Sequence, residues 1–269
     1  MTSNKKNQLL EQLRALAEQQ LSERTQKRDL AVEKMQALGT REDAETQAVL
    51  LEYLTQSDNE LLRPLAASRL GEIGGSAVLH ELLHQLESDI GDDVRILMIQ
   101  ILAEIGDSNA SELLISMLEG DYASEVRQRV AMALGKTGGE DAFDALINSV
   151  NDEGDNQVRQ QMISALGWLA DERAIPDLVR IMQTDTDKET QTFAAEALGR
   201  IGSERCYEPL VDTLQNRKYL PIVRYYAAYA LGLLGDERAI VPLQAISEAP
   251  SEHGWVAQMA SESLEKLQS

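Results

Sequence analysis

The 269-residue sequence is short of cysteine, of basic charge and of aromatic side chains, and each shortage excludes a class of protein. Its single cysteine, Cys206, cannot form an internal disulfide or supply a multi-thiolate metal site, which favours a reducing compartment. Lys and Arg number 25 against 45 Asp and Glu, and a net charge of −20 repels nucleic-acid phosphates and anionic membrane surfaces. We therefore expect neither nucleic acid nor membrane as a partner.

Long apolar runs are also missing. No stretch approaches the ~18 consecutive apolar residues that a membrane-spanning helix requires. The N-terminal residues, with Lys5, Lys6 and Arg14 in an amphipathic pattern, lack the apolar centre of a secretory signal. Apolar residues still make up 43% of the chain, which is enough for a core. We expect a soluble, cytoplasmic protein.

The most informative feature is an internal repeat built on Leu-Gly-x-Ile-Gly. Its copies begin at Leu70, Leu102, Leu134, Leu166, Leu198 and Leu231. The spacing is therefore 32 residues, with 33 at the last step. Leu38 and Leu264 extend the same register backwards and forwards, so that eight frames fill the chain.

Two further landmarks recur in each frame and predict a helical hairpin. Eight residues before the leucine stand Leu62-Arg63, Val94-Arg95, Val126-Arg127, Val158-Arg159 and Val223-Arg224, whereas the fifth frame has Thr190-Gln191. Prolines follow the leucine at Pro176, Pro209 and Pro242, which suits the first turn of a helix. Each frame thus predicts a helix A opening near the proline, an acidic loop, a helix B opening at Val-Arg with one apolar stripe, and a glycine-ended turn.

A single hairpin cannot bury its own apolar stripe, so neighbouring hairpins must stack. The predicted fold is all-α: a right-handed solenoid of about seven to eight hairpins with no strands. We predict a single structural domain, with N-terminal capping helices in 1–38, the repeat solenoid in 39–254 and a C-terminal capping helix in 255–269. In the last helix Gln258, Glu262 and Lys266 are expected to face water.

The pattern Val-Arg-x-x-Ala-x-x-Ala-Leu-Gly-x-Ile-Gly, with Ala-Ile-Pro-x-Leu, resembles the HEAT-like repeats of the phycobilisome lyase family over about residues 39–267. The resemblance implies a HEAT-like solenoid. It also implies a set of relatives that includes bilin lyase subunits, phycobilisome disassembly factors and adaptor proteins. Lyase-type activity and binding of a tetrapyrrole or phycobiliprotein thus follow from the resemblance only, as an alternative to a non-enzymatic adaptor. The matching positions are structural, so no catalytic residue is carried over.

One motif matches a metal site. His80-Glu81-Leu82-Leu83-His84 has the His-Glu-x-x-His pattern of zinc proteases, and Glu104 follows 20 residues after His84. The repeat register, however, places both histidines at solvated positions of helix A and Glu104 on helix B. We therefore interpret them as surface residues and predict no metal or other cofactor; a zinc hydrolase is the alternative.

Three other features each have two interpretations. The acidic loops between helices A and B suit N-capping of helix B and solubility, or attraction of a partner with a basic surface. The Val-Arg arginines suit a ladder of ion pairs to neighbouring loops, or a row of anion-binding groups. Cys206 suits a packed small apolar residue, or a nucleophile.

The candidate site lies on helix B, at the positions six and two before the repeat leucine and two after it, which share one helix face. These positions vary between frames, and in the seventh they hold Tyr225, Tyr229 and Leu233. With Trp168 and Arg200 of earlier frames they predict the groove of a non-enzymatic scaffold that binds a partner protein. The alternative is that these frames simply pack larger side chains under the terminal helix. The many exposed charges are compatible with a monomer.

Overall fold

The computed structural model describes residues 44–56, 62–87, 91–120 and 122–268, and every regular element in those ranges is a helix. The predicted capping helices in 1–38 lie outside the described residues. The chain divides into two compact units, with the boundary between Leu113 and Leu114 inside helix α7 (Ser111–Glu119). Among the described residues, no helix is both long and apolar enough to cross a membrane.

The first unit contains two helical hairpins. Its helices are α3 (Ala44–Gln56), α4 (Leu62–Ile73), α5 (Gly75–Leu86) and α6 (Asp92–Ile105), followed by a 3-10 turn at Ser108–Ala110. Helix α4 packs against both α3 and α6, and α5 packs against α6. Leu62, Leu70 and Met98 are completely or almost completely buried between these helices.

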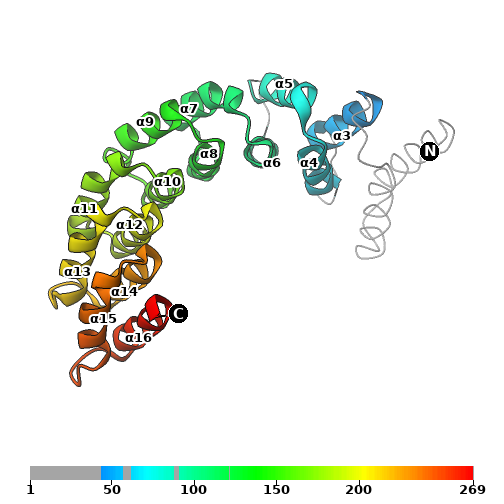
Figure 1. The fold of residues 1–269 in the computed structure, drawn as a ribbon. Helices are drawn as coiled ribbons and strands as arrows, with labels where there is room; N and C mark the ends of the chain where they lie inside the picture. Colours follow the sequence, from blue (N-terminus) through cyan, green and yellow to red (C-terminus); the bar gives the residue numbers. More distant parts are fainter. Residues whose placement is uncertain (1–43, 57–61, 88–90, 121, 269) are drawn as a thin grey trace, which may run out of the picture. The chain divides into compact units, whose positions relative to one another are not determined.

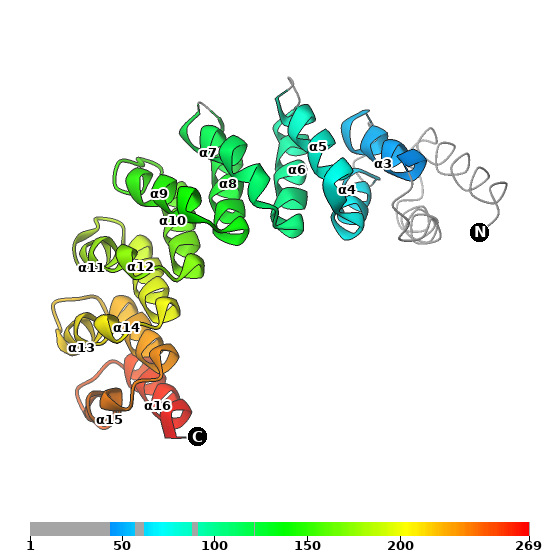
Figure 2. The same cartoon turned by 45° about the horizontal axis from the view of Figure 1, so that its top comes forward.

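The second unit repeats one hairpin. Its helices are α8 (Ser124–Thr137), α9 (Glu140–Ser149), α10 (Asn156–Leu169), α11 (Ile175–Thr184), α12 (Lys188–Ile201), α13 (Tyr207–Gln215), α14 (Pro221–Leu234), α15 (Ile240–Ser247) and α16 (Gly254–Gln268). The even-numbered B helices pack side by side from α8 to α16, and α11, α13 and α15 each pack on the B helix that follows (Figures 1 and 2). The prediction of an all-α solenoid of hairpins is confirmed.

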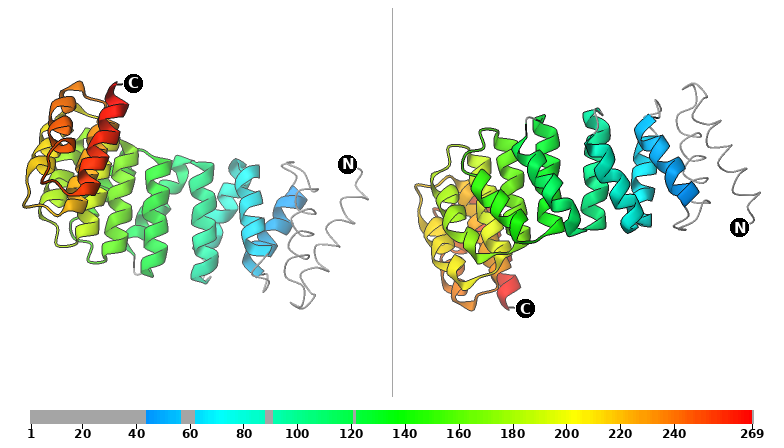
Figure 3. Two further views of the ribbon diagram at one scale, coloured as in Figure 1. Left: turned by 90° about the horizontal axis from the view of Figure 1, so that it is seen from below. Right: turned by 90° about the horizontal axis from the view of Figure 1, so that it is seen from above.

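Small residues set the spacing between B helices. A Cβ atom added to Gly199 would lie 2.7 Å from the Cα atom of Ala230, and one added to Gly167 would lie 2.9 Å from that of Ala197. These distances are shorter than a van der Waals contact, so the helix backbones touch. The close side-by-side arrangement of the helices of the second unit is visible in Figure 3.

The helix ends follow local chemistry. Asp155 and Asp187 cap α10 and α12, so these helices begin two residues before the Val-Arg position from which the sequence predicts them to start. Gly202 and Gly235 end α12 and α14 in the left-handed conformation. At the end of α10 that conformation falls on Ala170, with φ 54°, where the repeat lacks its second glycine.

Candidate binding face

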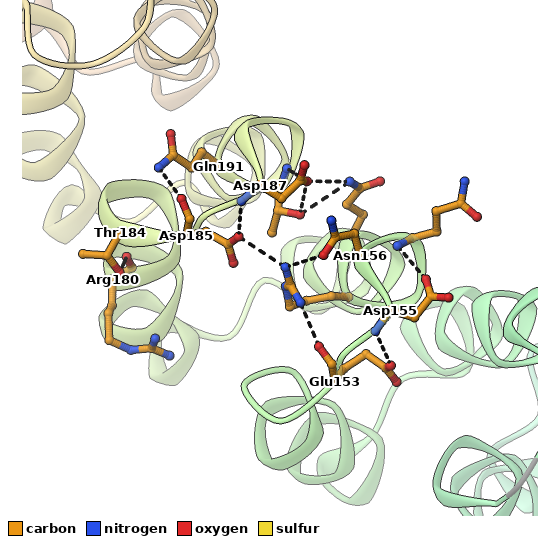
Figure 4. Close-up of polar contacts among 12 residues, drawn as sticks. Glu153, Asp155, Asn156, Arg180, Thr184, Asp185, Asp187 and Gln191 are labelled. Carbon is orange, nitrogen blue, oxygen red and sulfur yellow. Dashed lines mark hydrogen bonds and ion pairs between the residues drawn. The ribbon is translucent and has the colours of Figure 1, made fainter.

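Most of the Val-Arg arginines form ion pairs between successive repeats. Arg127 in α8 pairs with Glu153 in the loop before α10, and Arg159 in α10 pairs with Asp185 in the loop before α12 at 3.2 Å. Arg63 in the first unit also pairs with the next repeat, but its partner Asp93 lies in the first turn of α6 rather than in the preceding loop. Figure 4 shows Glu153 and Asp185 in their loops in the second unit. The ladder interpretation is confirmed for Arg63, Arg127 and Arg159, whereas Arg95 forms an ion pair with Asp92 of its own helix.

The fifth frame interrupts this ladder. Gln191 of α12 occupies the arginine position and donates from Nε2 to the backbone carbonyl of Asp185 at 2.8 Å. Arg159 donates in the same way to the carbonyl of Glu153 at 2.8 Å. In the next loop, the residue at the position of the acidic partner is Lys218. The cation and the anion are therefore both missing from the step between α12 and α14.

Aspartate caps supply a second link between B helices. Asp155 accepts from the backbone N–H groups of Gln157 and Val158 and from the hydroxyl of Ser124 in α8. The hydrogen bond from Ser124 is the main cause of a lowered pKa for Asp155. The hydrogen bond from the Thr190 side chain lowers the pKa of Asp187, which also accepts from Gln160 of α10. The acidic loops before α10 and α12 therefore act as helix caps, as the first interpretation predicts, whereas α6 and α8 begin at Gly91 and Ala123 without a side-chain cap.

The candidate site residues come from three consecutive B helices. On α14 the ring of Tyr226 meets the rings of both Tyr225 and Tyr229 edge to face, with ring centroids 5.3 Å and 6.4 Å apart. All three rings are half-buried, and Leu233, one turn further along, is 40% exposed. The structure thus brings Tyr225, Tyr229 and Leu233 together on one helix face, with Tyr226 joining the two other tyrosines.

Trp168 and Arg200 have different surroundings. Trp168, at the end of α10, packs over Gly135 of α8 and remains 38% exposed. Arg200 is ion-paired with Glu196 of its own helix at 2.7 Å. These two residues therefore lie on the same row of B helices as the tyrosines, but Trp168 packs on Gly135 and Arg200 pairs with Glu196.

Two residues that the sequence analysis leaves out of the site belong to the tyrosine cluster. Tyr226 lies between the two selected tyrosines, and Lys266 of α16 holds its Nζ atom 5.3 Å from the centre of the Tyr229 ring. The repeat register contains the signal for Lys266, because Lys266 in α16 is equivalent to Leu233 in α14. The contact itself depends on how α16 packs on α14.

The face continues to the N-terminal ends of α14 and α16. Ile222 and Trp255 stand at equivalent positions of these helices and are 37% and 61% exposed. In α12 the equivalent residue is Glu189. Trp255 also contacts the ring of His253, with ring centroids 4.7 Å apart. The N-terminal end of this face is therefore apolar in α14 and α16, whereas it is charged in α12.

The remaining candidates carry no site. His80 and His84 are exposed on α5, and Glu104 is exposed on α6. Within the ranges that the structure describes, no cluster of His, Cys, Asp and Glu side chains could hold a metal ion. Cys206 is fully buried in the 3-10 turn just before α13 rather than in the helix itself, and burial raises the pKa of its thiol to about 11. It is a packed core residue.

Comparison with known proteins identifies the repeat. The family model for HEAT repeats matches residues 79–167 and 151–220, which together span more than half of the chain. The chain belongs to the HEAT repeat family. The model for the PBS lyase HEAT-like repeat matches residues 223–248, which contain Tyr225, Tyr229 and Leu233. The resemblance drawn from the sequence is confirmed.

Several solved structures are similar to this chain, and the first of them shows the same class of fold. The YibA protein of Escherichia coli is 18% identical, with a TM-score of 0.57 over 100% of this chain and 97% of that one. Human deoxyhypusine hydroxylase is 20% identical, with a TM-score of 0.42 over 97% of each chain. The complex of CpcE and CpcF of phycocyanin lyase from Nostoc is 21% identical, with a TM-score of 0.45 over 94% of this chain and 93% of that one. A search of curated protein sequences finds no match.

Proposed function

We propose that this HEAT-repeat chain is a non-enzymatic scaffold that binds a partner protein on the B helices of its second unit. The contact residues are Trp168, Arg200, Tyr225, Tyr229 and Leu233. One observation carries the proposal: on α14 the variable positions are all aromatic or apolar, whereas on α8 they are Gln128, Met132 and Lys136. Tyrosine and tryptophan are the residue types that dominate protein-binding surfaces, because they offer large area at low entropic cost.

The experiment is affinity capture with the purified chain, followed by binding measurements on each captured protein. The double variant Tyr225→Ala, Tyr229→Ala is expected to lose the specific partner. The double variant Gln128→Ala, Met132→Ala is the matched control, because it truncates the equivalent positions of α8. Thermal melts of both variants check that the solenoid is intact. Capture of the same proteins by the wild type and by the tyrosine variant contradicts the proposal.

The second candidate function is binding of an open-chain tetrapyrrole, or of a phycobiliprotein that carries one. The match of residues 223–248 to the PBS lyase HEAT-like repeat favours it, because that segment contains the tyrosine face. Titration of the chain with a bilin is expected to shift and strengthen the visible absorption band of the pigment. The Tyr225→Ala, Tyr229→Ala variant should lose this change, and an unaltered bilin spectrum with the wild type excludes this candidate.

A further inference from the structure

The tyrosine cluster on α14 combines aromatic rings with negative charge. Tyr225, Tyr226 and Tyr229 lie edge to face along the helix, and α12, which packs against α14, carries Glu189 and Glu196 at the positions equivalent to Ile222 and Tyr229. Burial is the main cause of a raised pKa for Tyr226, and the negative charge of Glu196 raises it further. Burial disfavours a charge of either sign, whereas negative charge on α12 disfavours a phenolate and favours a cation.

An ammonium group already occupies part of this cluster. Lys266 reaches from α16 and places its Nζ atom over the ring of Tyr229, within the ~6 Å at which cation–π attraction is significant. Lys266 is exposed, so solvent competes with this contact and an incoming cation can replace it. The contact between Lys266 and Tyr229 therefore indicates that the cluster accepts a cationic group.

The positive charge of Arg200 on α12 is already paired. Arg200 donates to Glu196 from both Nε and Nη2, at 3.2 Å and 2.7 Å, so the charges of these two side chains offset each other inside the helix. The chain as a whole carries a net charge of −20, which attracts basic segments over distance. Charge complementarity thus points to one class of occupant.

We propose that the cluster of Tyr225, Tyr226 and Tyr229 binds a lysine or arginine side chain in a basic segment of the partner protein, and that Lys266 occupies this position in the free chain. The inference rests on the proposed scaffold function and specifies the chemistry of its partner. The rings supply cation–π attraction, and Glu189 supplies electrostatic attraction. A neutral or acidic segment would gain neither.

The test uses a short fluorescein-labelled peptide of alternating lysine and serine, with its acetyl-lysine counterpart as the uncharged control. Binding to the full chain is followed by fluorescence anisotropy at physiological ionic strength, where weak long-range attraction is screened. Only the charged peptide is expected to bind. In the double variant Tyr225→Phe, Tyr229→Phe the affinity should stay near that of the wild type, because phenylalanine keeps the aromatic face. In Tyr225→Leu, Tyr229→Leu it should fall about 4- to 25-fold, which corresponds to two lost cation–π contacts.

A variant of the competing lysine gives an independent readout. Lys266→Met frees the ring of Tyr229 and is expected to tighten peptide binding about 2- to 5-fold. Lys136→Met is the matched control, since Lys136 is the exposed lysine at the equivalent position of α8 and its removal changes the net charge equally. Equal effects of the two lysine variants overturn the inference, as do equal affinities in the Phe and Leu variants. Absence of peptide binding also overturns it, whereas the scaffold proposal fails only in the capture experiment.

Discussion

Arg224 of α14 and Glu252, in the loop before α16, form a two-pronged ion pair that is almost completely buried. Both guanidinium Nη atoms donate to the carboxylate at 2.7 Å, and the two side chains are 4% and 2% exposed. The Nε atom of Arg224 donates to the carbonyl of Leu214 at the end of α13, also at 2.7 Å. One arginine thus joins three segments of the last two repeats.

Removing one member of this pair should cost more than removing both. Glu252→Met leaves Arg224 buried without its counter-ion and is expected to lower the free energy of unfolding by about 3–5 kcal/mol. Adding Arg224→Met to that variant should recover part of the loss, because no isolated buried charge remains. Urea denaturation measures the free energy of unfolding of the single and the double variant. A double variant less stable than Glu252→Met would contradict the assignment of the loss to the unpaired charge.

The chain should lose stability in acid. Hydrogen bonding to Arg224 holds the pKa of Glu252 below its ordinary value of 4.5, and that of Asp187 is held below 3.8 by Thr190. A carboxylate with a lowered pKa in the folded state stabilises the fold fully above its ordinary pKa, and this stabilisation disappears as the pH falls through the lowered value. We therefore expect the urea midpoint to be unchanged between pH 7 and 6 and to fall steeply below about pH 4.5.

The variant Asp187→Asn separates this cause from general acid unfolding. Asparagine still caps a helix but does not titrate, so the variant should be less stable than the wild type at neutral pH and should lose less stability in acid. An identical acid-induced loss in the two proteins would show that Asp187 contributes nothing to the pH dependence.

Substitution of Gly199 should disturb the packing of α12 on α14. An added Cβ atom would lie 2.8 Å from the Cβ atom of Ala230 and 3.0 Å from its carbonyl oxygen, so the helices must separate. Gly199→Ala is expected to cost about 1–3 kcal/mol and Gly199→Val more. Gly154→Ala is the control, because open space surrounds that glycine. Normal melting of Gly199→Val would contradict the close helix contact.

Restoring the missing step of the arginine ladder should stabilise the chain. Gln191→Arg alone places a second cation near Lys218, and Lys218→Glu alone adds an unpaired carboxylate. The combined variant recreates the pair formed by Arg159 and Asp185 one repeat earlier. A double-mutant cycle in urea is expected to give a favourable coupling of about 0.5–3 kcal/mol. A coupling of zero would show that loop geometry, rather than charge, interrupts the ladder.

Cys206 should be unreactive until the chain unfolds. Burial raises the pKa of its thiol to about 11, so almost none is thiolate at pH 8, and its side chain is inaccessible. Iodoacetamide is expected to leave the native protein unmodified and to alkylate Cys206 quickly in urea, as followed by mass spectrometry. Rapid alkylation of the native protein would contradict the core placement.

For the predicted site, the sequence indicates which residues share a helix face but not which residues of adjacent helices contact them. The spacing of Tyr225, Tyr229 and Leu233 predicts a shared helix face, and the structure places them on one. Sequence distance says nothing of which B helix covers which ring, so the contact of Lys266 with Tyr229 could not be predicted. The same holds for the packing of Trp168 over Gly135. Both contacts depend on the offset between adjacent helices.

The sequence by itself determines the repeat and the hairpin, and it places the Val-Arg arginines that the structure then shows in ion pairs. Leucine, Val-Arg and glycine recur at intervals of 32 or 33 residues, and each acts within its own turn or on the next repeat, so local periodicity is enough to predict it. The tertiary structure alone decides which side chains of the variable face meet. Backbone contact at Gly167 and Gly199 sets how far apart the B helices lie, and this spacing determines which rings and charges come within reach of one another.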